Sequence, residues 1–95
     1  MKIEMRPVVQ SWNIEKEFGI RVLDCNFTQG VENDSYVPLW LDKDRRDELW
    51  EDIRYYTAKG DGESAYVRRL ENELDLINRF RAMGYTDSIL VFVSW

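Results

Sequence analysis

The feature that most constrains this chain is an uninterrupted apolar run close to residue 90. Within residues 88–94, the five consecutive residues Ile89 to Val93 are all apolar. A strand with one wet face alternates apolar and polar side chains, whereas a strand that is central in its sheet or covered on both faces does not. The run therefore predicts a central strand at 88–94, around which the rest of the chain packs.

Two helical patterns come before this run. Asp42 or Asp44 can cap the first helix, and Gly60 ends it. The second helix is predicted from about 63 to 83, with Gly84 just beyond its end. The short link between them predicts an antiparallel helical hairpin. The expected core-facing residues are Leu49, Trp50, Ile53 and Tyr56 on the first helix and Tyr66, Val67, Leu70, Leu74, Ile77 and Phe80 on the second.

The first 41 residues contain three segments that are predicted to be strands. They are residues 2–12, 20–27 and 36–41, and a short polar connection of about one helical turn at 13–18 lies between the first two. The first two strands are expected to pair as a hairpin. Pro7 and Pro38 lack a ladder donor, which favours edge positions. Trp12 and Trp40 are expected in the core; alternatively, Tyr36, Pro38 and Trp40 form an exposed aromatic ridge if the other side of their strand faces the helices.

These elements predict an α+β fold with the order β-β-β-α-α-β. The helical hairpin would pack on one face of a mostly antiparallel sheet of about four strands, giving two layers. A chain of 95 residues is long enough for one hydrophobic core and too short for two, so residues 1–95 are expected to form a single globular domain.

Composition narrows the classes of function. The chain has no histidine, which removes the usual neutral-pH acid/base and the commonest zinc ligand. Its single cysteine, Cys25, cannot form an internal disulfide, no segment resembles a signal peptide, and no run reaches the roughly 18 apolar residues that span a bilayer. We therefore expect a cytoplasmic protein that is not an enzyme, needs no cofactor or metal and does not enter a membrane.

The net charge of −5 is concentrated in one stretch. Between Glu32 and Asp52 there are eight acids and three bases, and the rest of the chain is balanced. On the first predicted helix these acids fall on the outward side, together with one tyrosine. The candidate partner-binding residues are Asp44, Asp47, Glu48, Glu51 and Tyr55.

Two interpretations of this acidic face stay open. Soluble helices need a solvated side, and acids near a helix start are favoured by its dipole. However, Asp47 with Glu51 and Glu48 with Asp52 are like-charge pairs four residues apart, which destabilise a helix by a few tenths of a kcal/mol each. A helix selected only for stability would mix its charges. The row therefore also fits a complement to a basic surface on another protein.

Other chemistry for the carboxylates has weaker support. Asp42, Asp44 and Asp47 lack the spacing of a calcium-binding loop, and solvated carboxyl groups do not acquire the raised pKa of a general acid. Glu73 falls on the apolar side of its helix, where an ion pair with Arg69 or Arg81 is the expected explanation.

We therefore expect a non-enzymatic inhibitor that occupies a basic, often nucleic-acid-binding, surface of a partner protein. Phage-encoded anti-defence proteins and toxin-immunity proteins are of this type. The acidic balance argues against direct binding to nucleic acid. Two alternatives remain: a small-molecule or nucleotide-sequestering module that uses Arg45, Arg46 and the tyrosines, and a structural subunit of a larger assembly. A homo-oligomer is compatible with each of them.

Overall fold

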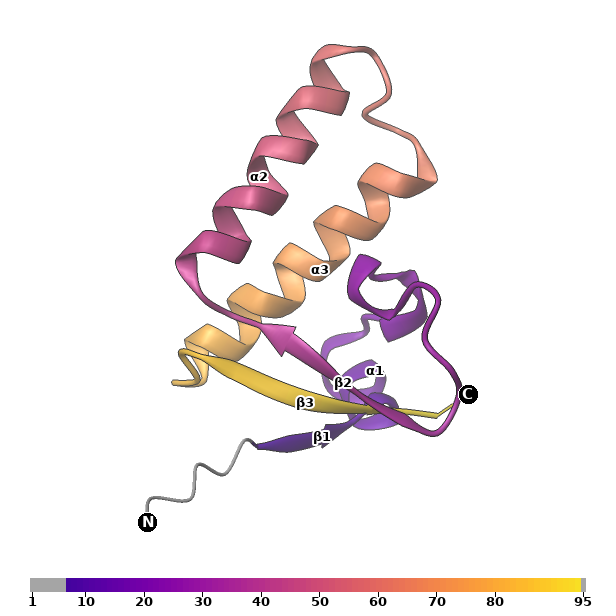
Figure 1. Ribbon diagram of the computed structural model, residues 1–95, viewed down its shortest axis with the longest axis vertical. Coiled ribbons are helices and arrows are strands. Elements are labelled where there is room, and N and C mark those ends of the chain that lie inside the picture. Colours follow the sequence, from indigo (N-terminus) through magenta and orange to yellow (C-terminus); the bar gives the residue numbers. More distant parts are fainter. Residues whose placement is uncertain (1–6, 95) are drawn as a thin grey trace.

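The computed structural model describes residues 7–94 and confirms the α+β class (Figure 1). Three helices accompany one three-stranded sheet in the described part of the chain. In chain order the elements are β1 (Val8–Gln10), α1 (Ser11–Phe18), the 3₁₀ turns η1 (Val22–Asp24) and η2 (Asn26–Thr28), β2 (Ser35–Trp40), α2 (Lys43–Ala58), α3 (Ala65–Ala82) and β3 (Ser88–Val93).

The sheet has the order β1-β3-β2, so the apolar run forms the central strand as predicted. β2 pairs with β3 in the antiparallel direction, with Val37 opposite Val91. β1 pairs with β3 in the parallel direction, with Val8 opposite Leu90. The sheet is therefore mixed, and the predicted hairpin between the first two strands is wrong.

The second predicted strand, residues 20–27, is also wrong, because this segment folds into η1 and η2. Its backbone carbonyls are satisfied by side chains in place of a strand ladder. The Thr28 hydroxyl donates to the carbonyls of Val22 and Cys25, and the Gln29 amide donates to those of Leu23 and Cys25 at 3.0 Å each. Such local bonds compete with sheet pairing.

The polar connection predicted at 13–18 belongs to a longer helix. α1 begins at Ser11, so the first strand ends at Gln10 and not at residue 12. The part of that predicted strand at residues 2–6 lies outside the described residues. Ile14 of α1 is buried, and Phe18 packs edge-on against Phe80 of α3 with ring centroids 5.4 Å apart. The short helix therefore contributes to the core.

The helical hairpin forms as predicted. α2 and α3 lie side by side, and Figure 1 shows them extending well beyond the sheet. Asp42 occupies the N-cap of α2 without a side-chain capping bond, whereas the Ser64 hydroxyl accepts a hydrogen bond from the Val67 amide at the start of α3. Gly84 follows α3 with a φ of +103°, a conformation that favours glycine.

One face of the sheet is covered, and no described helix packs on the other. Val37 and Leu39 of β2 and Val91 of β3 point into the core, where they join Ile14 of α1 and Ile77 of α3 in one buried cluster. The intervening strand residues point to the opposite side. The registers place seven of them on this second side, called here the open sheet face: Val8, Gln10, Tyr36, Pro38, Trp40, Leu90 and Phe92.

Three tryptophans that were expected in the core are half-exposed. The exposed fractions are 57% for Trp12, 46% for Trp40 and 51% for Trp50. Trp12 lies on α1 and not on a strand, and Trp40 lies on the open sheet face. α2 buries only Leu49 and Ile53, because its described tertiary packing is mainly against α3. Its apolar stripe is therefore narrower than predicted and leaves Trp50 at the surface.

Candidate functional site

The five predicted partner-binding residues all lie on α2, and all are exposed: Asp44, Asp47, Glu48, Glu51 and Tyr55. We call them the acidic face. Leu49 and Ile53 hold the opposite side of α2 against the core, which fixes the acidic face outward. The geometry agrees with the predicted placement, and its role in binding stays a prediction.

Only part of the acidic face is neutralised by neighbouring cations. Lys43 Nζ lies 2.6 Å from Asp47, and this hydrogen bond and charge raise the pKa of Lys43. Arg45 lies 3.4 Å from Glu48. Within residues 7–94, neither Asp44 nor Glu51 forms an ion pair. Lys43, Asp47 and Glu48 are largely exposed, so solvent screens their charges, and the surface keeps its negative character although Arg45 is mostly buried.

Tyr55 adds an aromatic group to the end of the acidic face. Its side chain is 55% exposed. Its ring packs edge-on against Tyr56 with centroids 5.1 Å apart, and Lys59 Nζ lies 4.7 Å from its centroid. Contacts on two sides limit the motion of the ring while leaving it accessible. A partly fixed tyrosine beside charge is typical of protein interfaces.

Glu73 has a different partner from either of those predicted. Its side chain is fully buried, and one carboxylate oxygen accepts from Nε and from the terminal nitrogen of Arg45, both at 2.8 Å. Burial raises the pKa of Glu73, while Arg45 and the backbone N–H of Phe27 act in the opposite direction. Arg45 thus connects α2 to α3. Of the two arginines that the nucleotide-binding alternative uses, Arg45 is therefore already engaged, which leaves Arg46.

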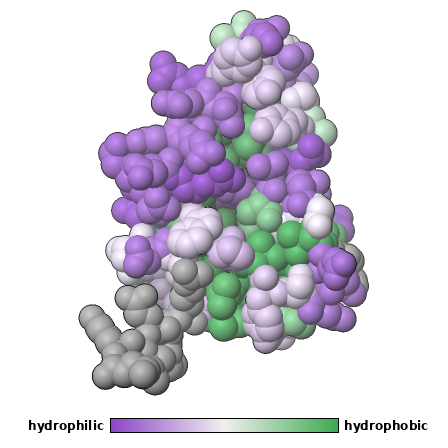
Figure 2. Space-filling model, in the orientation of Figure 1, coloured by the Kyte–Doolittle hydropathy of each residue, from purple (hydrophilic) through white to green (hydrophobic). Residues whose placement is uncertain are grey.

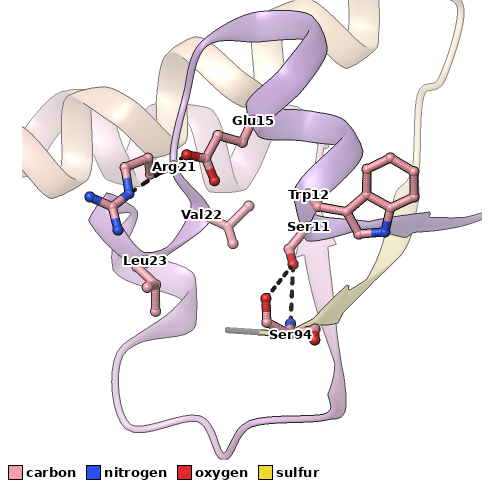
Figure 3. A pocket seen from close by; sticks show the side chains of 7 residues that line it. All are labelled: Ser11, Trp12, Glu15, Arg21, Val22, Leu23 and Ser94. Carbon is pink, nitrogen blue, oxygen red and sulfur yellow. Dashed lines mark hydrogen bonds and ion pairs between the residues drawn. The ribbon is translucent and has the colours of Figure 1, made fainter.

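A cavity of about 240 Å³ lies between α1, η1 and the end of β3 (Figure 3). Ser11 Oγ donates to the Ser94 carbonyl at 3.3 Å and accepts from its amide at 3.1 Å. Glu15 and Arg21 form a loose pair at 3.9 Å, and the Trp12 ring stands at the opposite side in Figure 3. The Ser11 hydroxyl and the Ser94 backbone therefore satisfy each other, whereas Glu15 and Arg21 are too far apart for a hydrogen bond.

The open sheet face carries exposed apolar side chains on the side opposite the core. Tyr36 is 62% exposed and Val8 is 52% exposed. The ring of Tyr36 rests against Phe92 with centroids 5.0 Å apart. Figure 2 shows hydrophobic surface gathered in the part of the molecule that holds the sheet, while hydrophilic surface covers the hairpin. Tyr36, Pro38 and Trp40 lie on the same side of β2, as the alternative of an exposed aromatic ridge requires.

Two classes of site are not found among residues 7–94. No group of three or more acidic or cysteine side chains there is arranged to hold a metal ion. No described helix is long and apolar enough to cross a membrane. Comparison of the whole chain with protein families, with curated proteins and with solved structures found no match.

Proposed function

We propose that this protein is a non-enzymatic binding domain that inhibits a partner protein by occupying a basic surface with its acidic face. The observation that carries the proposal is the row of exposed carboxylates on one side of α2, in which Asp44 and Glu51 have no ion pair within the described residues. The Cβ atoms of residues three and four positions apart on a helix are about 5 to 6 Å from each other. That spacing suits a surface of clustered lysines and arginines.

Recognition then has a steering component and an anchoring component. The negative potential speeds association with a basic partner and makes the rate fall as salt is added. Tyr55 anchors the complex, because a tyrosine buries a large area at little conformational cost. A partner surface that normally holds nucleic acid fits this description, as in the targets of anti-defence or immunity proteins.

The test is a pull-down from the lysate of the natural host, with mass spectrometry, at low and high salt. The variant Asp47→Lys/Glu51→Lys reverses two charges on the acidic face. The control Glu71→Lys/Asp75→Lys makes the same change at the same spacing on exposed positions of α3. A protein retained by the wild type and by the control, but lost with the acidic-face variant and at high salt, supports the proposal. Equal retention by both variants contradicts it.

The open sheet face favours a second candidate, in which the chain is a structural subunit that pairs with another copy of itself. The seven residues of this face are uncharged, so a basic partner gains nothing there. Its β2 side carries the large Tyr36 and Trp40, and its β1 side carries the smaller Val8 and Gln10. A two-fold axis parallel to the strands would place the large side of one copy on the small side of the other.

Salt separates the two candidates. Strand rise and spacing give the face dimensions of roughly 20 by 14 Å. Its area is therefore well below the ~800 Å² per partner of a standard interface, and the dimer should be weak. Since each copy carries −5, added salt strengthens the dimer and weakens the acidic contact. In analytical ultracentrifugation, Trp40→Lys should abolish the dimer, whereas Trp50→Lys, at similar exposure on α2, should retain it. A wild type that stays monomeric at high salt rejects this candidate.

A further inference from the structure

A small cavity at the far end of the helical hairpin extends the acidic face. It measures about 200 Å³, and its four lining residues are Tyr56, Asp61, Ser64 and Tyr66. We call it the tyrosine notch. Tyr56 comes from the last turns of α2, Tyr66 comes from the first turn of α3, and the link between the helices supplies Asp61 and Ser64. The two rings meet edge-on with centroids 5.3 Å apart.

The polar groups that line the notch are suited to accept hydrogen bonds. Asp61 is exposed, and its carboxylate has no ion pair within residues 7–94. Ser64 Oγ already accepts from the Val67 amide at 3.2 Å. The faces of the tyrosine rings carry the negative part of the aromatic quadrupole. A ligand with several donors and a positive charge would satisfy such a lining, whereas a second anion would not.

The surroundings of the notch also attract positive charge. Burial and the nearby Asp52 carboxylate raise the pKa of Tyr66, and Arg45 and Arg69 oppose them only in part. Two cations of the chain already lie against tyrosine rings here: Lys59 is 4.7 Å from the centroid of Tyr55, which is beside the notch, and the Arg69 guanidinium is 5.9 Å from that of Tyr66, which lines it. Arg69 does not line the notch, so the cavity itself remains open to a cation from outside.

We propose that the tyrosine notch binds an arginine side chain that projects from the basic surface of the partner. The inference rests on the proposed function, because the basic partner of that proposal supplies the arginine that the notch binds. The planar guanidinium would stack on Tyr56 or Tyr66 and direct its forked donors at Asp61. Tyr55 lies next to Tyr56, so the notch and the acidic face form one continuous surface.

The notch can be tested without the partner. N-acetyl-arginine amide is titrated into the full chain, and the ring resonances of Tyr56 and Tyr66 are followed by NMR. N-acetyl-citrulline amide, which has the same shape and no charge, is the matched ligand. We expect saturable shifts with the arginine compound at millimolar concentrations and at least fivefold weaker binding of the citrulline compound.

Two variants and two controls complete the test. Asp61→Asn should weaken arginine binding about threefold and Tyr66→Leu about fivefold, since they remove one charge and one ring. Glu71→Gln on exposed α3 and Tyr85→Leu at another half-buried tyrosine should leave it unchanged. Absence of saturable shifts, equal binding of both ligands, or wild-type affinity in Asp61→Asn overturns the inference. If the notch binds arginine while the charge-reversed acidic face retains the partner, only the proposed function fails.

Discussion

Replacing Arg45 with methionine should destabilise the domain far more at neutral pH than in acid. The substitution keeps most of the side-chain volume and removes the two Arg45 donors from the fully buried Glu73, while the backbone N–H of Phe27 remains. Leaving one member of a buried ion pair costs about 3 to 5 kcal/mol. Because the Arg45 side chain is 23% exposed, we expect the lower end, about 3 kcal/mol. A domain of this length has roughly 5 to 14 kcal/mol in total.

The pH dependence identifies the cause. Burial holds the pKa of Glu73 above its ordinary value near 4.5, and loss of Arg45 raises it further. A raised folded-state pKa means that the folded state binds the proton more tightly, so stability is full below the unfolded pKa and falls as pH rises through the folded pKa. The cost of Arg45→Met should therefore be small at the acidic end of this window and largest at neutral pH.

Urea unfolding is followed by circular dichroism at neutral pH and at the acidic end of the window. It measures the free energy of unfolding of the wild type and of Arg45→Met. The double variant Arg45→Met/Glu73→Leu provides the comparison, since it removes the buried charge together with its partner. We expect it to lie within about 1 kcal/mol of the wild type. The reasoning is refuted if Arg45→Met loses less than about 1 kcal/mol at neutral pH, if its loss is equal at both pH values, or if the double variant is the least stable of the three.

Three further predictions concern the rest of the domain. Deleting Ile89 to Trp95 removes the central strand and should abolish the cooperative melt in circular dichroism; a truncated chain that melts like the full one contradicts the topology. Burial raises the pKa of the Cys25 thiol to about 12, so a chromogenic disulfide reagent at mildly alkaline pH should modify it only on unfolding, and rapid native labelling contradicts its burial. Ser64→Ala should lower the free energy of unfolding by about 1 kcal/mol in urea titrations, because it removes the cap of α3; no loss would show that the Val67 amide is satisfied otherwise.

Elements with long and regular patterns could be predicted from the sequence. α3 shows apolar spacing over several turns and ends at Gly84, and β3 is an unbroken apolar run. Neither depends on a distant partner for its type. The segment at 20–27 has a comparable apolar content, but its form depends on where the side chains of Thr28 and Gln29 donate, which a period of two does not encode.

Long-range partners account for the remaining differences. β1 has only three residues and pairs with a strand more than 80 positions later, so no local signal distinguishes a parallel partner from a hairpin. For the same reason the sequence predicts an ion pair of Glu73 with Arg69 or Arg81, whereas its partner Arg45 is 28 positions earlier on another helix. The acidic face was easier to predict, because solvent exposure on one side of a single helix follows from periodicity alone.

The central strand β3 follows every other described element along the chain, and this order has a consequence for synthesis. α2 and α3 can pair as soon as residues 43–82 have been made, whereas β2 and β1 must wait for β3. At about 5 to 20 residues per second the interval is short. During it, Val37 and Leu39 lack the strand whose backbone pairs with theirs. We expect the like charges along α2, whatever else they bind, to keep nascent chains from associating through these residues until the sheet closes.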